Sequence, residues 1–292
     1  MAILDWLART ARTGELGTFS PRALRWLGPG GWLGGIFRLA FRPAVTDWEH
    51  LPERGPFLVV ANHSGGGGAD VATLATHWAE TFGSERTLAA LAHPLAFHCP
   101  GAAALLREFG AIPSSYERAI EALRAGVPVL VFPGGDHEAF RPIWQAYRVD
   151  FNRRQGFLRL AREAWIPIVP LGLRGSHFTV PILWRSKVLP WVQVLPRLLG
   201  LKRFPLTLAA IVGSTSILAL AGPAWGYPLA GFLAWAWLSS PTNVLLPQIP
   251  WKVSVEVGAP IPPDVLFGPD RERSLDDAYD QVLAAVQALV LS

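Results

Sequence analysis

The sequence predicts an α/β fold with a mixed, largely parallel sheet flanked by helices, and three observations lead to this prediction. Short continuous apolar runs such as Phe57–Ala61 and Ile166–Leu173 are typical of strands buried on both faces. Segments with helical patterning separate these runs, as in proteins that alternate strands and helices. Glycine and proline mark most of the junctions. With 292 residues, the chain is long enough to bury a sizeable core.

The expected elements follow one another along the chain from residue 46. The predicted strands are Phe57–Ala61, Leu88–Ala92, Val127–Phe132, Ile166–Leu173 and, with one solvated face, Lys252–Val257. The predicted helices are Val71–Phe82, Tyr116–Ala125, Phe157–Ala164 and Ser274–Leu291. Because ligands bind at the carboxyl ends of strands in such sheets, the residues after Ala61 and after Phe132 are the first candidates for a site.

Residues 1–45 carry the whole positive excess of the chain. Six arginines face two acidic residues in this segment, and the net charge of the full chain is +4. Tryptophan and phenylalanine lie between the arginines, so the segment predicts amphipathic helices at an anionic membrane surface. A helical collar packed on the core is the alternative interpretation. Glycines at 14, 17 and 28–31 are expected to break the helices.

The segment from Phe204 to Trp251 has no charged residue. It contains two apolar helical stretches, Leu206–Ala221 and Pro228–Leu238, and Gly222-Pro223 is expected to break the chain between them. Each stretch is shorter than the ~20 residues that a spanning helix needs. A re-entrant or interfacial hairpin is therefore favoured over two complete spans, and either arrangement predicts attachment to a bilayer.

The chain is accordingly divided into four regions. Residues 1–45 are the N-terminal membrane-associated helices, 46–203 the α/β core, 204–251 the apolar hairpin, and 252–292 the closing strand and C-terminal helix of the core. Half of the residues (51%) are hydrophobic and only 16% are charged, which favours a lipid-associated protein over an ordinary soluble domain. No cleavable signal is evident, so we expect a protein of the inner or plasma membrane with its site on the cytoplasmic side.

The candidate catalytic pair is His63 and Asp70. His63 follows an apolar strand, Gly65–Gly68 follow it, and Asp70 comes back within reach at the start of a predicted helix. A neutral imidazole can take a proton from a hydroxyl, and a carboxylate on its other nitrogen fixes the tautomer and stabilises the imidazolium. The alternative for Asp70 is an ordinary helix N-cap.

Other site classes find less support in the sequence. The glycine tract lacks the Gly-Lys-Ser/Thr ending of a phosphate-binding loop, and no Gly-x-Ser-x-Gly elbow is present. The single cysteine, Cys99, excludes an internal disulfide, and His93, His98 and Cys99 fit a connecting segment better than a metal site. Basic and aromatic residues also suit nucleic acid, but no recognition motif accompanies them. We therefore expect no metal, no cofactor and no nucleic-acid partner.

Several stretches, read together, resemble the lysophospholipid (glycerolipid) acyltransferase superfamily. The order and approximate spacing of the superfamily's blocks recur over about Phe57–Gly175, and Val257–Ile261 looks like its closing strand. The matching stretches are Asn62-His63 with Asp70, Gly110–Pro113, Val131–Glu138, Arg154–Phe157 and Ile166–Pro170.

The resemblance implies acyl transfer from an acyl-CoA or acyl-carrier-protein thioester to a lipid hydroxyl, without a covalent acyl-enzyme. His63 would be the general base and Asp70 would orient it. The third block implies an acceptor site formed by Pro133, Gly134, Gly135 and Glu138. Arg141 and Arg154 would bind phosphate groups, since guanidinium matches phosphate bidentately. Ile168 and Pro170 match the fourth block and would line the acyl channel or only form the sheet. The implied partners are membrane lipids and the acyl carrier.

Two departures from the superfamily pattern bear on the acceptor. Six residues separate His63 from Asp70 where four are usual, and Gly134 replaces the usual glutamate of a Pro-Glu-Gly block. Pro-Gly-Gly followed by Glu138 resembles the branch that includes acylglycerol acyltransferases, so the acceptor can be phosphorylated or neutral. The alternatives to an acyltransferase are a non-catalytic lipid-binding or membrane-tethering protein of the same fold, and a lipid hydrolase that uses His63 with water.

Overall fold

The computed structural model describes residues 16–63, 68–97, 100–188, 190–191 and 204–292. Its centre is a seven-stranded sheet with the order β1-β9-β6-β2-β5-β3-β4, which confirms the predicted α/β class. The strands are β1 (Ala44–Thr46), β2 (Leu58–Ala61), β3 (Ala89–Ala92), β4 (Ala111–Pro113), β5 (Val129–Val131), β6 (Ile168–Arg174) and β9 (Ser254–Val257). Between the described strands of this sheet, every pairing is parallel except that of β6 with β9, so the sheet is mixed and mostly parallel.

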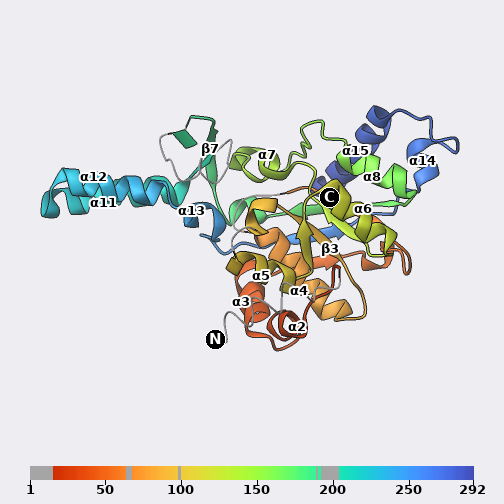
Figure 1. The fold of residues 1–292 in the computed structure, drawn as a ribbon. Coiled ribbons are helices and arrows are strands. Elements are labelled where there is room, and N and C mark those ends of the chain that lie inside the picture. Colours follow the sequence, from red (N-terminus) through yellow and green to blue (C-terminus); the bar gives the residue numbers. More distant parts are fainter. Residues whose placement is uncertain (1–15, 64–67, 98–99, 189, 192–203) are drawn as a thin grey trace.

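Helices cover both faces of this sheet (Figure 1). One face packs against helices from the middle and the end of the chain: α6 (Tyr116–Arg124), α8 (Gly156–Ala164), α14 (Pro263–Phe267) and α15 (Leu275–Leu291). The other face packs against α2 (Pro21–Leu27) and α4 (Ala69–Phe82), with α3 (Trp32–Phe41) against α4. Shorter helices complete the body: η1 (Trp48–His50), η2 (Pro94–Phe97), α5 (Pro100–Glu108), α7 (Gly135–Ala139), η3 (Ile143–Gln145) and η4 (Ser176–Phe178).

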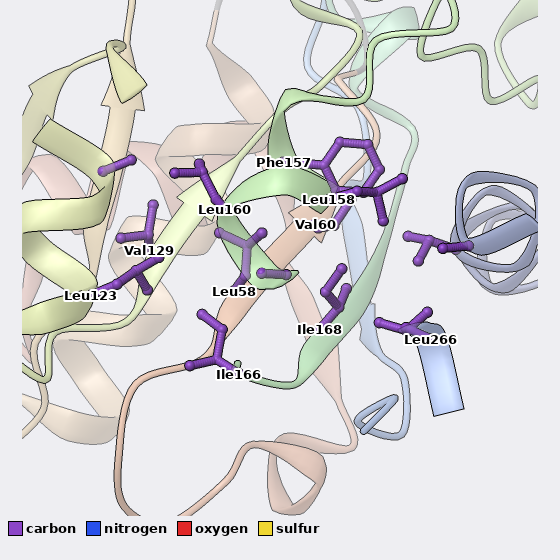
Figure 2. Close-up of a cluster of buried hydrophobic side chains, with 14 of the residues drawn as sticks. Leu58, Val60, Leu123, Val129, Phe157, Leu158, Leu160, Ile166, Ile168 and Leu266 are labelled. Atoms are coloured by element: carbon purple, nitrogen blue, oxygen red, sulfur yellow. The ribbon is translucent and has the colours of Figure 1, made fainter. Parts of the chain in front are cut away.

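The alternation of side chains along β2 explains the two cores. Leu58 and Val60 point into the first core, where Figure 2 shows them beside Val129 and Ile168. Val59 and Ala61 point into the second core, with Trp78 of α4. A strand buried on both faces must be apolar at every position, which is why the run Phe57–Ala61 was readable from the sequence.

The two described N-terminal helices pack against the core and also expose apolar side chains. Ala23 and Leu27 of α2 are buried in the second core. In contrast, Trp32, Ile36 and Leu39 of α3 are exposed. The turn at 28–31 separates the helices as expected, and part of the predicted amphipathic segment, residues 1–15, lies outside the described residues.

A long helical hairpin projects from one end of the body (Figure 1). It begins after a two-stranded sheet of β7 (Ile182–Ser186) and β8 (Phe204–Thr207), and it consists of α11 (Leu208–Trp225) and α12 (Tyr227–Leu238) followed by α13 (Thr242–Leu245). Within the described part of the chain, α11 is long and apolar enough to cross a membrane, and 11% of it is buried inside the protein.

The expected break at Gly222-Pro223 is wrong. Helix α11 continues through Pro223, and the chain reverses at Gly226, which has a φ of 88°. Proline removes one backbone hydrogen bond and crowds the preceding turn, but Pro223 lies only two residues from the helix end, where little helix remains to be disrupted. Gly226 adopts the positive φ that a side chain would strain.

Candidate active site

The site forms where two neighbouring parallel strands end. Strands β2 and β5 pair from Leu58 with Val129 to Val60 with Val131, so the residues after both strands emerge at the same edge of the sheet. His63 follows β2, and Phe132 and Pro133 follow β5. The rings of His63 and Phe132 stack with centroids 4.7 Å apart. The sheet thus brings the predicted base and the Pro-Gly-Gly turn together, as the sequence predicted.

Asn62 fixes the backbone directly before His63. Its side chain is completely buried and makes two hydrogen bonds with Leu173 of β6: Nδ2 donates to the carbonyl at 2.9 Å, and Oδ1 accepts from the N–H at 2.7 Å. Strand β2 ends at Ala61, and the side chain of Asn62 then bonds to the backbone of β6 in place of a further backbone pairing. Sequence reasoning gave Asn62 no role of its own, because its partner is 111 residues away.

His63 contacts Asp70 directly. Nδ1 of His63 lies 2.6 Å from Oδ2 of Asp70, and the carboxylate is 0% exposed, whereas the His63 side chain is 24% exposed. When Nδ1 carries the proton and donates to Asp70, Nε2 is left as a proton acceptor. Among the described residues, Nε2 has no hydrogen-bond partner, so the geometry suits a base at the accessible edge of the sheet.

Asp70 is held by the start of helix α4. The helix begins at Ala69, and its N-cap is Gly68, with a φ of 62°, so the N-cap alternative for Asp70 is wrong. Asp70 lies in the first turn, where exposed backbone N–H groups stabilise a negative charge. The six-residue spacing therefore delivers the carboxylate to His63 through a glycine that permits the left-handed backbone before the helix.

Glu138 of α7 holds the backbone of the site. One carboxylate oxygen accepts the N–H of His63 at 3.0 Å, and the other accepts the N–H of Asp150 at 3.1 Å. The Glu138 side chain folds over Gly134, where a Cβ atom would overlap it. The glycine that replaces the usual glutamate of this block thus makes room for a glutamate four residues later.

Arg141 lies behind Glu138 and is 1% exposed. Its Nη1 is 3.6 Å from Oε1 of Glu138, and its Nε donates to the Glu138 carbonyl at 3.2 Å. Burial lowers the pKa of Arg141, and Glu138 and Asp150 counteract this. Predicted as a phosphate ligand, Arg141 is placed by the structure as the buried partner of Glu138.

Arg154 is committed to the Pro-Gly-Gly turn. Its Nη1 donates to the carbonyls of Pro133 and Gly134 at 3.2 and 3.1 Å, and its Nη2 donates to Asp136 at 3.0 Å. The guanidinium therefore holds the Pro133–Gly134 turn, which follows β5 and lies beside His63. This arrangement was not readable from the sequence, which assigned Arg154 to substrate phosphate.

Ile168 and Pro170 lie within β6, next to β2. Ile168 pairs with Leu58 and is buried in the first core, and Pro170 pairs with Val60 and accepts a hydrogen bond from Gly258. Both positions therefore form the sheet, one of the two roles that the resemblance left open.

The pKa values of His63 and Glu138 are both raised, but for different reasons. Burial lowers the pKa of His63, but the charge and hydrogen bond of Asp70 and the charge of Glu138 together raise it above its usual value. Burial raises the pKa of Glu138 to about 7, against the opposing effects of Arg141 and of the two backbone N–H donors. The charges of His63 and Glu138 thus influence each other's protonation.

Two further histidines lie near the site. His137 Nε2 is 3.0 Å from Asp150 Oδ2, and Arg185 of β7 donates to the His137 carbonyl. His177 of η4 is buried, and burial together with the charges of Arg141 and His63 lowers its pKa well below the usual value. Among the described residues no cluster of three or more His, Cys, Asp or Glu side chains could hold a metal ion, and His98 and Cys99 lie outside them.

Comparison with known proteins assigns part of this chain to a family. The acyltransferase family model matches residues 42–174, which include β2, β5, β6 and every site residue discussed above except His177 and Arg185. Residues 42–174 belong to the acyltransferase family. The match ends at Arg174, the last residue of β6, so the apolar hairpin and the C-terminal helix lie outside it.

Relatives of this acyltransferase segment are found in bacteria and mammals. An uncharacterized protein of Mycobacterium leprae is 32% identical over 66% of this chain and 49% of its own length. The DGAT1/2-independent enzyme synthesizing storage lipids of Bos taurus is 32% identical over 51% of this chain and 43% of its own length. The chain spans about half the length of the curated relatives that it matches.

One solved structure also aligns with this chain. The crystal structure of the 1-acyl-sn-glycerophosphate (LPA) acyltransferase PlsC from Thermotoga maritima aligns with a TM-score of 0.49 and 17% identity. The alignment covers 99% of this chain and 88% of that chain.

Proposed function

We propose that this acyltransferase moves a fatty acyl group from a thioester donor, acyl-CoA or acyl carrier protein, to the hydroxyl of a lipid. The observation that carries the proposal is the 2.6 Å contact between His63 Nδ1 and the buried Asp70, which leaves Nε2 of a partly exposed imidazole at the edge of the sheet. The match to the acyltransferase family supports the reaction class, and the name of the mammalian relatives refers to synthesis of storage lipids.

In the proposed reaction, His63 Nε2 accepts the proton of the acceptor hydroxyl while the hydroxyl oxygen attacks the thioester carbonyl carbon. The C–O bond of the new ester forms and the C–S bond breaks. The proton then passes from the imidazolium to the leaving thiolate. Asp70 stabilises the imidazolium through Nδ1 and is not itself consumed. A thioester is already activated, so a positioned base that contributes ~10²–10⁴ in rate is a sufficient device.

We further propose that the preferred acceptor is uncharged. Arg154, one of the two arginines that the sequence assigned to phosphate, donates to the carbonyls of Pro133 and Gly134. Arg141, the other, is 1% exposed and lies 3.6 Å from Oε1 of Glu138, and its two Nη atoms have no hydrogen-bond partner among the described residues. Gly134 also removes the carboxylate that the superfamily usually places in the acceptor wall. The Pro133, Gly134 and Gly135 backbone then faces the acceptor without a fixed phosphate ligand.

The proposal includes work at a membrane with the site on the cytoplasmic side. It is supported by the basic excess of residues 1–45, because positive segments are retained on the cytoplasmic side of membranes.

The test is purified protein in lipid vesicles with radiolabelled acyl-CoA or acyl carrier protein and a panel of acceptors. We expect ester formation that depends on acceptor, faster with monoacylglycerol or a long-chain alcohol than with lysophosphatidic acid. Release of free fatty acid without acceptor would instead indicate a hydrolase. Absence of ester with every acceptor and both donors, from protein that binds lipid and is folded, would favour a non-catalytic lipid-binding protein.

A further inference from the structure

The α11–α12 hairpin has the surface of a structure that is surrounded by lipid on all sides. Its exposed residues include leucine, valine, phenylalanine and tryptophan on both helices, and no charged residue occurs between Phe204 and Trp251. A helix that lies flat in a membrane interface needs one polar face and one apolar face. Neither α11 nor α12 has a charged face, so the flat arrangement does not fit.

Three polar side chains of the hairpin, Ser214, Thr215 and Trp237, bond to backbone carbonyls within the hairpin. Ser214 Oγ donates to the carbonyl of Ala234 at 3.0 Å, and Thr215 Oγ1 donates to the carbonyl of Ile211 at 2.9 Å. The indole of Trp237 donates to the carbonyl of Ala209 at 3.0 Å. In hydrocarbon, each of these groups would carry a free-energy cost if it had no partner. These groups therefore need no water as a hydrogen-bond partner, which suits the hydrocarbon layer of a membrane.

Small residues lock the two helices together. A Cβ atom on Gly213 would overlap the ring of Trp237, and one on Gly222 would overlap the ring of Tyr227. Close contact at glycine is a common way for helices to associate in lipid, where burial of apolar surface gives no driving force. The hairpin is thus one rigid unit from its base to its tip.

The tip is polar in a way that the shaft is not. The last carbonyls of α11 and the first N–H groups of α12 have no intrahelical partners, and the N-cap residue, Gly226, has no side chain to supply one. Trp225 and Tyr227 flank Gly226 and are 66% and 67% exposed. Tryptophan and tyrosine favour membrane interfaces, where one end of the ring is in lipid and the other near water. A tip left in the middle of the hydrocarbon would bury these backbone groups without partners.

The length of α11 is close to the thickness of the hydrocarbon layer of a bilayer. The 18 residues of α11 make a helix of about 27 Å, compared with a hydrocarbon layer of about 30 Å. The 12 residues of α12 make a helix of about 18 Å, so the return leg includes the residues that follow α12 up to α13. At the base, the body has exposed Trp184 on β7 and exposed Trp251 beside Lys252. Figure 1 shows β7, α13 and α3, with its exposed Trp32, at the end of the body from which the hairpin projects. These aromatic and basic groups suit the near interface.

We propose that the α11–α12 hairpin crosses the hydrocarbon layer of a bilayer to the opposite interface and returns. The body then rests on one membrane surface, and Trp225–Tyr227 lies among the headgroups of the other leaflet. This attachment does not depend on the proposed acyl transfer, because it follows from the hairpin alone.

The depth of single spin labels along α11 tests the proposal. In a Cys99→Ser background, exposed positions are changed one at a time to cysteine and labelled: Leu208, Thr215, Ala219 and Ala224. Each variant is placed in phospholipid nanodiscs, and the accessibility of the label to oxygen and to a water-soluble nickel chelate is measured. Ala284→Cys on α15, exposed on the body, is the matched aqueous control. The unfolding midpoint of every labelled variant verifies that the body is folded.

We expect the ratio of oxygen to nickel accessibility to rise from Leu208 to Thr215 and Ala219 and to fall again at Ala224. A ratio that keeps rising to Ala224 would place the tip within the hydrocarbon and overturn the proposal. A ratio that alternates with the helical period would show a hairpin lying flat, and labels hidden from both reagents would show a hairpin covered by a second copy of the chain. Either result would also overturn it.

Discussion

Two histidine–aspartate pairs lie near the same edge of the sheet, and they differ in which atoms they leave accessible. His63 uses Nδ1 to contact Asp70 at 2.6 Å, and Asp70 is fully buried at the start of α4. His137 uses Nε2 to contact Asp150 at 3.0 Å, and Asp150 is one-third exposed. His63 thus presents Nε2 outward, whereas His137 is held by Asp150 and by Arg185 through its own carbonyl.

A histidine–aspartate pair alone does not define a catalytic base. A carboxylate stabilises an imidazolium most effectively where water does not screen it, and Asp70 meets this condition better than Asp150. The two pairs are also connected, because Glu138 accepts the N–H of His63 with one oxygen and that of Asp150 with the other. We therefore assign the proton transfer to His63 and a supporting role to His137.

The largest expected effect comes from His63→Ala. Removing the base should lower turnover by ~10²–10⁴ while the affinity for lipid vesicles stays unchanged. The matched control is His137→Ala, made in the second pair. Acyl transfer from labelled acyl-CoA is measured for both, and a His63→Ala protein with full activity would refute the assignment of the base.

Asp70→Asn should have the next largest effect. An asparagine keeps the size of the side chain, but it accepts a weaker hydrogen bond from His63 Nδ1 than the carboxylate does, and it carries no charge to stabilise the imidazolium. Turnover should therefore fall by ~10²-fold. Asp150→Asn, the corresponding change in the other pair, should lower turnover by less than threefold. Equal losses in the two variants would remove the distinction between the pairs.

The sequence predicted the parts of this site that depend on local pattern. Apolar runs located β2, β5 and β6, and the rule that ligands bind at strand ends selected His63 and Pro133–Gly135. The contact of His63 with Asp70 was accessible to prediction because only seven positions separate the two residues.

Interactions between distant residues were not predictable in the same way. Asn62 bonds to Leu173 only because β6 lies beside β2, and Arg154 reaches the Pro133–Gly134 turn from the start of α8. Likewise, α11 continues through Pro223 because the chain reverses only at Gly226, which adopts the positive φ of the turn. Charge and composition around these residues say which groups need partners, but not which partners the fold supplies.

The pH dependence of turnover separates the pairs further. His63 must be neutral to accept a proton, and its pKa is raised, so turnover should increase with pH until the pH exceeds this raised value. Below it, the rate should fall about tenfold per pH unit. Asp70→Asn removes the charge and weakens the hydrogen bond that raise the pKa of His63, so the rise of turnover with pH should move to lower pH. Asp150→Asn should leave this rise in place. A rise that does not move in Asp70→Asn would contradict the pairing.

Stability should depend on pH in the opposite direction. The folded-state pKa values of His63 and Glu138 are both raised above their unfolded values, so each contributes stability that is complete below the unfolded pKa and is lost as pH rises through the folded one. For Glu138 the window runs from 4.5 to about 7. The free energy of unfolding in urea, measured across this window, should fall less steeply in Glu138→Gln than in the wild type.

Glu138→Ala tests the connection between the two pairs. It removes the acceptor for the N–H groups of His63 and Asp150 and leaves Arg141 buried without its partner, so the free energy of unfolding should fall by about 1–3 kcal/mol. Turnover should fall about tenfold through misplacement of His63. Adding Arg141→Met should restore part of the stability without restoring turnover. Recovery of both would show that Glu138 acts only through Arg141.

The smallest expected effect on turnover comes from His137→Ala. The ring contacts Asp150 and makes no contact with the His63–Asp70 pair among the described interactions, so its loss should change turnover by less than threefold. The hydrogen bond to Asp150 and the packing of the ring contribute to stability, so the unfolding midpoint should fall by about 2–4 °C, as expected for a loss of about 1 kcal/mol. Both quantities are measured on the same preparation. A hundredfold loss of turnover with an unchanged midpoint would place His137 in the proton transfer and exchange the roles of the two pairs.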